Sequence, residues 1–268
     1  MTLRARMAPT PSGFLHWGNL LNFALTWVYV RREGGELALR IDDVDATRAR
    51  TDYVDDIFTT LNWLGFDWDH GPQTSDEFQK KFSQSARTEE YRLWFSKFPG
   101  YACACSRQEV RDRTDKRYDG FCRHRGLSLE REKTQWRLLA DIPEHDIVLW
   151  RKEDLPAYHL VSLFEDLRFG SNLIIRGEDL MESTVSQKYL ASMLGRDGQN
   201  FLHAHFVHHK LLFDEHGHKL SKSDGADALK SWRERGKSAA DVFIELSRRA
   251  GWPTIHSLQE ILEKGIIA

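Results

Sequence analysis

Cysteine is scarce in this chain of 268 residues: there are three, and Cys103, Cys105 and Cys122 lie close together in one stretch. An odd, local group of cysteines argues against a disulfide framework and is typical of a metal site in a reducing compartment. Long apolar runs are also missing, since no stretch approaches about 18 uncharged apolar residues, so no membrane span is expected. Residues 1–6 are not followed by the apolar segment of a signal peptide. We therefore expect a cytoplasmic protein.

An excess of charge of one sign is absent as well. The 38 lysine and arginine residues face 40 aspartate and glutamate residues, for a net charge of -2. This balance argues against a strongly basic nucleic-acid-binding protein, although a local basic face can bind RNA within a neutral chain. The hydrophobic share of 41% is enough for a real core. The length fits one large domain with an insertion, or two modest domains.

Strand-like and helical patterns alternate on both sides of the cysteines, which predicts an α/β fold with a parallel sheet. The predicted strands are 3–8, 36–41, 158–163, 172–176 and 206–208. The predicted helices are about 20–31, 53–64, 84–97, 179–194, 226–235 and 239–250. Residues 101–130 break this alternation, and strand-like runs follow at 135–139 and 147–151. We expect an insertion between two halves of one sheet.

Two segments far apart in the chain predict a nucleotide site when they are taken together. In residues 8–19, His16 and Gly18 stand at the start of a helix, where free N–H groups and the helix dipole favour an anion. Residues 218–225 form a loop with two lysines and two serines, among them Lys219, Ser221 and Lys222. Separately, His16 could be only a helix cap, and lysine–serine loops are usually solvated. Together they indicate a nucleotide gripped from both sides, with chemistry at the α-phosphate.

Charged residues also follow two predicted strands, at the sheet edge where ligands bind in open α/β folds. Asp42 opens an acidic run after the strand at 36–41, and its carboxylates could hold an ammonium group or a ribose hydroxyl. A solvated acidic turn is the alternative. Arg176 ends the strand at 172–176, where its guanidinium could bind a ligand carboxylate or pair with Glu178 or Asp179.

The cysteine segment reads Cys103-x-Cys105 and then Cys122-Arg-His124. Three thiolates and one further ligand make a tetrahedral zinc site of the structural type. On ligand chemistry alone, His124 is the obvious fourth ligand, and three unrelated buried thiols are the alternative. The sequence has no His-Glu-x-x-His motif, so nothing suggests catalytic zinc.

The motifs and their order resemble the class I aminoacyl-tRNA synthetases of the glutamyl type, most closely the short paralogues called glutamyl-Q tRNA(Asp) synthetases. The matching motifs lie at residues 6–18, 40–45, 157–160, 174–177 and 219–222. The short paralogues also carry Cys-x-Cys followed by Tyr-x-Gly-x-Cys-Arg, as at 103–105 and 118–123. The resemblance implies a Rossmann-type parallel sheet with a zinc-bearing insertion and a small C-terminal helical region that contacts the RNA stem.

The resemblance implies a glutamate pocket and a zinc site. Asp42 would meet the substrate ammonium, and Tyr158 and Arg176 would hold the side-chain carboxylate. The pocket residues would be Arg6, Ala8, Thr10, Asp42, Tyr158 and Arg176. In the family pattern the fourth zinc ligand is the tyrosine, so the metal set would be Cys103, Cys105, Tyr118 and Cys122, with His124 as the second choice for the fourth position. Asp42 stands where the family has glutamate, which shortens the reach by about 1.5 Å, and Thr10 replaces a serine.

The resemblance also implies an ATP site in which His16 and Lys222 are catalytic. The ATP-binding set would be His16, Gly18, Asn19, Lys219, Ser221 and Lys222. Asn19 stands where many class I enzymes have a second histidine. Glutamate and ATP, assisted by Mg²⁺, would give glutamyl-adenylate and pyrophosphate, and glutamate would pass to queuosine of tRNA(Asp). An adenylating paralogue with a non-tRNA acceptor and a non-enzymatic nucleotide-binding module are the alternatives.

The same reasoning predicts four regions along the chain. Residues 1–98 and 154–215 would form the two halves of the Rossmann catalytic domain, with the zinc-containing insertion at 99–153. Residues 216–268 would carry the lysine loop and the stem-contact helices. About 45 residues follow the loop, too few for a full anticodon-binding region. A monomer that does not bind membranes is expected.

Overall fold

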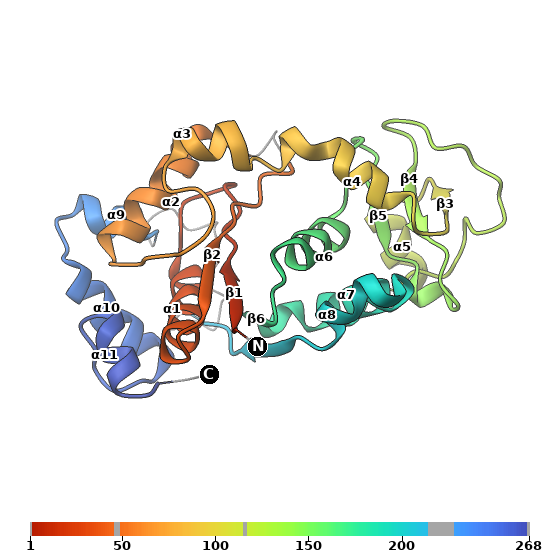
Figure 1. Ribbon diagram of the computed structural model, residues 1–268. Helices are drawn as coiled ribbons and strands as arrows, with labels where there is room; N and C mark the ends of the chain where they lie inside the picture. The colour runs from red at the N-terminus through yellow and green to blue at the C-terminus, as the bar shows by residue number, and fades with distance from the viewer. Residues whose placement is uncertain (1, 46–48, 115–116, 214–227, 267–268) are drawn as a thin grey trace. The chain divides into compact units, whose positions relative to one another are not determined.

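The computed structural model describes residues 2–45, 49–114, 117–213 and 228–266, and these form two compact units (Figure 1). Unit 1 takes its residues from 1–85, 171–181 and 204–268, and unit 2 takes them from 86–170 and 182–203. Within the described residues, no helix is both long enough and apolar enough to cross a bilayer. The predicted boundaries of the four regions stay a prediction.

Unit 1 contains two pairs of parallel strands. Strand β1 (Arg4–Met7) pairs with β2 (Glu36–Leu39), and β6 (Leu173–Gly177) pairs with β7 (His205–His209). Asn172, just before β6, links the pairs, because its side-chain oxygen accepts from the Arg4 N–H at 2.8 Å and its own N–H donates to the Arg4 carbonyl at 3.0 Å. The prediction of an α/β fold with parallel strands is confirmed.

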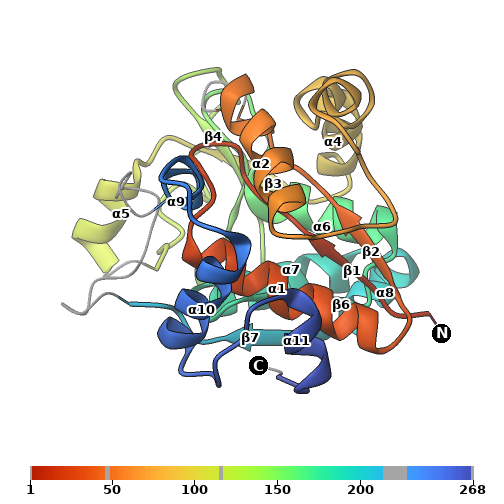
Figure 2. The same ribbon diagram turned by 90° about the vertical axis from the view of Figure 1, so that its left-hand side faces the viewer.

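Helix α1 (Trp17–Arg32) is the centre of the core of unit 1. It packs against β1, β2 and β6, and its buried side chains lie on nearly every side of the helix. Two C-terminal helices, α10 (Ala239–Ala250) and α11 (Leu258–Glu263), pack against α1 in turn (Figure 2). Gly34, with a φ of 60°, follows the end of α1 and turns the chain back into β2. The tail of the chain therefore completes the core around its first helix.

Unit 1 contains further helices and helical turns. They are α2 (Thr51–Trp63), α3 (Ser75–Glu77), a π-helical turn (Phe78–Phe82), a 3₁₀ turn (Glu178–Leu180) and α9 (Leu229–Glu234). Helix α9 packs on α2.

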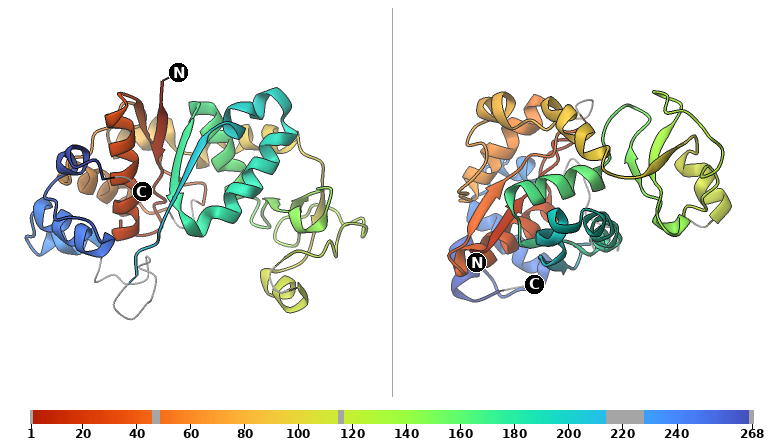
Figure 3. Two further views of the ribbon diagram at one scale, coloured as in Figure 1. Left: turned by 90° about the horizontal axis from the view of Figure 1, so that it is seen from below. Right: turned by 45° about the vertical axis from the view of Figure 1, so that its right-hand side comes forward.

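Unit 2 combines helices with an antiparallel sheet in the order β3-β4-β5 (Figure 3). The strands are β3 (Gly100–Cys103), β4 (Gln135–Leu138) and β5 (Val148–Trp150). The helices are α4 (Thr88–Phe95), α5 (Arg107–Thr114), α6 (Tyr158–Phe169), α7 (Met181–Met193) and α8 (Gln199–Leu202), with 3₁₀ turns at Ser85–Arg87, Pro143–His145 and Gly195–Gly198. The strand-like runs that follow the cysteines are therefore confirmed as strands.

The predicted strand over 158–163 is wrong, because these residues open helix α6. Leu160, Leu163 and Phe164 are buried at the three- and four-residue spacing of one helix face. Gly170, in the left-handed conformation, then caps the helix. The short apolar run was ambiguous between strand and helix, and packing of the following residues decided it.

A partly buried ion pair fastens α9 to α2. The Nη2 atom of Arg233 lies 2.6 Å from Oδ1 of Asp56, and its Nη1 donates to Oγ1 of Thr60 at 2.6 Å. Asp56 is 5% exposed. This carboxylate therefore depends on Arg233 for its neutralising charge.

We expect Arg233→Leu to lower the free energy of unfolding by about 2 kcal/mol, because it leaves a buried carboxylate without its hydrogen-bonded cation. The melting temperature should fall by about 4–8 °C, as followed by circular dichroism. Arg50→Leu is the control, because the Arg50–Asp52 pair has side chains that are 63% and 46% exposed. It should leave the melting temperature unchanged. Equal losses in the two variants would contradict this account.

Candidate functional site

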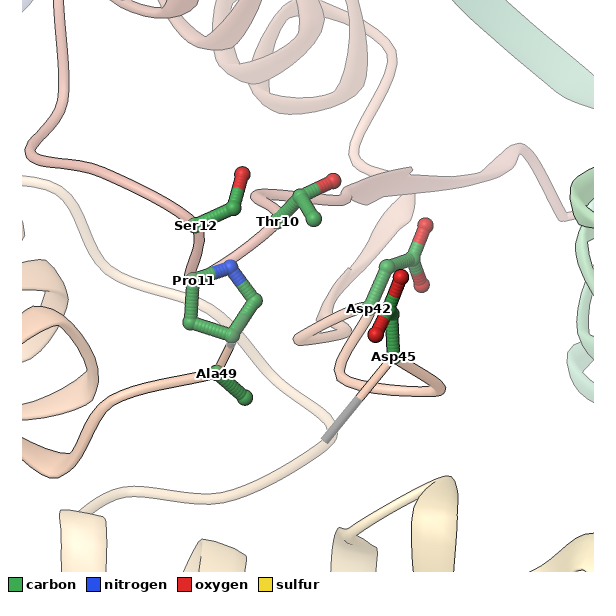
Figure 4. A pocket seen from close by; sticks show the side chains of 6 residues that line it. All are labelled: Thr10, Pro11, Ser12, Asp42, Asp45 and Ala49. Atoms are coloured by element: carbon green, nitrogen blue, oxygen red, sulfur yellow. The ribbon is translucent and has the colours of Figure 1, made fainter. Parts of the chain in front are cut away.

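A small pocket opens where β1 and β2 end (Figure 4). Its lining residues come from the loops that follow the two strands: Thr10, Pro11, Ser12, Asp42, Asp45 and Ala49. The carboxyl ends of parallel strands meet at one edge of a sheet, so the loops after them share that edge. The structure thus brings together Thr10 and Asp42, which belong to separate sequence motifs.

Fixed donors hold the Asp42 carboxylate at this pocket. Nε and Nη2 of Arg40 donate to its two oxygens at 2.7 and 3.1 Å, and Nε2 of Gln84 donates to Oδ1 at 2.8 Å. Burial raises the pKa of the Asp42 carboxyl, while the charge of Arg40 and the two hydrogen-bond donors act in the opposite direction. The side chain is 16% exposed. Asp42 is therefore a fixed group and not a solvated turn residue.

Asp43, its neighbour, has a structural role. Its carboxylate accepts from Oγ of Ser83 at 2.6 Å and from the backbone N–H of Gln84 at 2.6 Å, and the residue is 6% exposed. Asp43 thereby anchors residues 83–85 to the end of β2. Sequence reasoning missed Gln84, which lies 42 residues beyond Asp42. A glutamine in a polar stretch carries no local signal of such a contact.

Two further predicted pocket residues lie on or directly after β1. Arg6 is 5% exposed, and its positive charge opposes the rise in the Asp42 pKa that burial causes, so it lies near that carboxylate. Ala8 is half-buried and follows the last residue of β1. Both positions are compatible with the predicted amino-acid pocket.

Arg176 and Tyr158 belong to different units. Arg176, in β6, is 3% exposed, and its guanidinium carbon lies 5.5 Å from the centre of the Phe206 ring. Tyr158 is the first residue of α6 and is 43% exposed. Their joint contact with a substrate carboxylate stays a prediction.

His16 caps helix α1, as the simpler of the two sequence interpretations proposed. The ring Nδ1 of His16 accepts from the backbone N–H of Gly18 at 3.1 Å. The backbone N–H of His16 donates to the side-chain Oδ1 of Asn19 at 3.1 Å. Because Nδ1 is an acceptor, the neutral imidazole carries its proton on Nε2. The cap and a phosphate contact are thus compatible, since each would use a different ring nitrogen.

Residues 214–227 lie outside the described residues, and with them Lys219, Ser221 and Lys222. The prediction that this loop meets the His16 turn around one ATP stays a prediction.

The three cysteines converge in unit 2. Their sulfur atoms all lie within 4.8 Å of one another, and those of Cys105 and Cys122 are 3.6 Å apart. Tetrahedral zinc with Zn–S bonds of about 2.3 Å separates two sulfurs by about 3.8 Å, so the spacing fits this metal. The cluster of thiols is compatible with zinc in both ligand type and geometry.

Tyr118 and two arginines surround this cluster. The Tyr118 hydroxyl lies 3.4 Å from Sγ of Cys103 and accepts from the Cys122 N–H at 2.9 Å. Nε of Arg137 lies 3.3 Å from Sγ of Cys103, and Nη2 of Arg113 lies 3.4 Å from Sγ of Cys105. The ring of Tyr118 is buried, whereas His124 is exposed.

The thiols have different proton affinities. Burial raises the pKa of the Cys103 thiol, but the Tyr118 hydroxyl and the charge of Arg137 outweigh it and lower the value to about 7. Burial and the two neighbouring cysteines raise the pKa of Cys105 to about 11. Ionising Cys105 therefore costs more free energy than ionising Cys103. A bound cation would offset the repulsion between the thiolates.

Comparison with known proteins defines the class of the chain. A family model described as "tRNA synthetases class I (E and Q), catalytic domain" matches residues 2–140. Among solved structures, the glutamate-tRNA synthetase from Elizabethkingia anophelis superposes with a TM-score of 0.75 at 23% identity, over 98% of this chain and 65% of that one. The chain thus spans less than two thirds of that structure, and the likeness shows the class I synthetase fold.

Curated relatives show to which family within the class I synthetases the chain belongs. A glutamyl-Q tRNA(Asp) synthetase of a Synechococcus species is 38% identical, over 91% of this chain and 82% of its own length. Enzymes of the same name from Parasynechococcus marenigrum and Deinococcus radiodurans are 34% and 30% identical, and 92% and 93% of their lengths are covered. The chain belongs to the glutamyl-Q tRNA(Asp) synthetase family and is a ligase of the class I aminoacyl-tRNA synthetase type.

Proposed function

We propose that this ligase activates glutamate with ATP and transfers it to queuosine in tRNA(Asp). The observation that carries the proposal is the pocket that joins Thr10 to Asp42 at the strand ends. The loop that carries Thr10 leads into the His16-capped helix. The acceptor is the one in the names of the relatives.

Glutamate would be held at both ends. Asp42 would accept from its α-ammonium, with Arg6, Ala8 and Thr10 around it. Arg176 and Tyr158 would bind the side-chain carboxylate, because a buried guanidinium is the natural partner of that group. The α-carboxylate is then left to react.

The reaction would join this carboxylate to ATP. A carboxylate oxygen attacks the α-phosphorus, the bond to the β-phosphate oxygen breaks, and pyrophosphate leaves. The Nε2–H of His16 would donate to an α-phosphate oxygen as charge develops there. Gly18 and Asn19 would contact the nucleotide from the same helix end, and Lys219, Ser221 and Lys222 from the loop. Mg²⁺ bound with ATP supplies further neutralisation of phosphate charge.

Zinc would have a structural role in unit 2. Cys103, Cys105 and Cys122 would hold it, with the buried Tyr118 as the fourth ligand in preference to the exposed His124. The bound ion would tie β3 to the segment that carries Tyr118 and Cys122.

An exchange and transfer assay tests the overall proposal. We expect ATP–pyrophosphate exchange that depends on L-glutamate, and labelling of queuosine-containing tRNA(Asp) with radioactive glutamate. The same tRNA without queuosine is the control and should stay unlabelled. Absence of exchange with every amino acid, or equal labelling of both tRNAs, would refute the proposal.

Two substitutions separate the two roles of His16. His16→Asn keeps a side-chain acceptor for the helix cap but removes Nε2, so the melting temperature should be unchanged while kcat of exchange falls about 10²- to 10³-fold. His16→Ala should show the same loss of rate and also lower the free energy of unfolding by about 1 kcal/mol. Full activity of His16→Asn would show that the histidine serves only as a cap.

Metal analysis tests the zinc ligands. Protein purified without chelator should contain about one zinc per chain, measured by atomic emission. Tyr118→Phe should release zinc to a competing chelator at lower chelator concentration, because the phenyl ring offers no ligand. His124→Ala should behave like the unaltered chain, and the reverse order would reassign the fourth ligand.

A further inference from the structure

The side-chain amide of Gln84 is the least expected partner of Asp42, which lines the pocket. Gln84 is 1% exposed, and its backbone N–H is fixed by Asp43 at 2.6 Å. Its Nε2 donates to Oδ1 of Asp42 at 2.8 Å. Both ends of this residue are therefore tied to the acidic run at the end of β2.

The orientation of this amide follows from its partner. Both carboxylate oxygens of Asp42 accept from Arg40, and the nitrogen of the Gln84 amide donates to Oδ1, so the amide oxygen is the end of the group that does not contact Asp42. That oxygen, Oε1, is buried and has no hydrogen-bond partner among the residues that the structure describes. A buried acceptor without a donor costs free energy, which a ligand donor would recover.

We propose that Oε1 of Gln84 accepts a hydrogen bond from the substrate's α-ammonium, beside the carboxylate of Asp42. This inference rests on the proposed function, since it names a further residue of the same glutamate site. An ammonium group carries three donors and needs several acceptors around it. Both oxygens of Asp42 already accept from Arg40, so Asp42 has less capacity left for the ammonium than an unpaired carboxylate would have. The ammonium therefore needs a second acceptor at this site.

The chemistry of the surroundings favours a cation over other ligands. An acceptor oxygen next to Asp42, with Asp45 also lining the pocket, would repel the phosphates of ATP or a substrate carboxylate. A neutral hydroxyl would satisfy Oε1 but would gain nothing from the carboxylate charge. Asp42 is one methylene shorter than the glutamate of the family pattern. The Gln84 amide would compensate for this by supplying a second contact to the ammonium end of the ligand.

A binding experiment with two ligands isolates this contact. Glutarate is glutamate without the ammonium, so it reports every contact except the one in question. Isothermal titration of the full chain should show that Gln84→Met weakens binding of L-glutamate by about 10- to 100-fold, as expected for a hydrogen bond to a charged group. Binding of glutarate should change by less than about twofold.

A second variant separates direct contact from positioning of Asp42. Gln84→Glu loses the donor to Asp42 but keeps an acceptor oxygen, so it should recover most of the affinity for L-glutamate that Gln84→Met loses. Ser83→Ala removes a hydrogen bond of the same turn to Asp43 and should not change the affinity for either ligand. If Gln84→Met does not fold by circular dichroism, Gln84→Asn takes its place, because it withdraws the same oxygen by one methylene.

The outcomes distinguish this inference from the function on which it rests. Failure of the unaltered chain to bind L-glutamate would overturn both. Normal binding of L-glutamate by Gln84→Met, or equal weakening of L-glutamate and glutarate, would overturn the Gln84 contact alone. Equal weakening of L-glutamate binding in the Met and Glu variants would also overturn the direct contact, since it would reduce Gln84 to a positioning residue.

Discussion

The parallel pairing of β1 with β2 is the constraint on which the candidate site depends. Because the two strands run in the same direction and in register, the loops after Met7 and Leu39 leave the sheet at one edge. That shared edge places Thr10 beside Asp42. Arg40 and Gln84 then fix the carboxylate through three hydrogen bonds, so its position is set before any ligand arrives. A preorganised acceptor loses little free energy to reorientation on binding.

The start of α1 shows how one residue can serve stability and chemistry together. The Nδ1 atom of His16 satisfies a backbone N–H that the first turn of the helix cannot pair. This same bond selects the tautomer in which Nε2 is a donor. The helix therefore orients the ring that the proposed reaction uses. In the cysteine cluster of unit 2, two residues likewise both position a side chain and change its chemistry. Arg137 and Tyr118 contact the Cys103 sulfur and lower its thiol pKa to about 7.

Several features were predictable because they depend on local patterns. The period of apolar residues predicted the helix at about 20–31 that is observed as α1. The spacing of the cysteines predicted their convergence, since a short polar segment offers them few alternatives. The strand over 158–163 was wrongly predicted, because a short apolar run fits a strand and a helix equally well until its packing partners are known. Asp42 was assigned to the site, but its arginine and glutamine partners were not.

The sequence by itself determined the family, the order of the motifs and the residue types that the chemistry needs. The family, the motif order and the residue types can all be read from contiguous segments, such as residues 6–18 and 40–45. Only the tertiary structure decided that Asp43 anchors a turn while Asp42 faces the pocket, and that Gln84 joins them. The reason is physical: neighbouring residues in an extended chain point to opposite sides, and which side becomes the site depends on what packs against it from elsewhere. Contacts across 42 residues leave no trace in local periodicity.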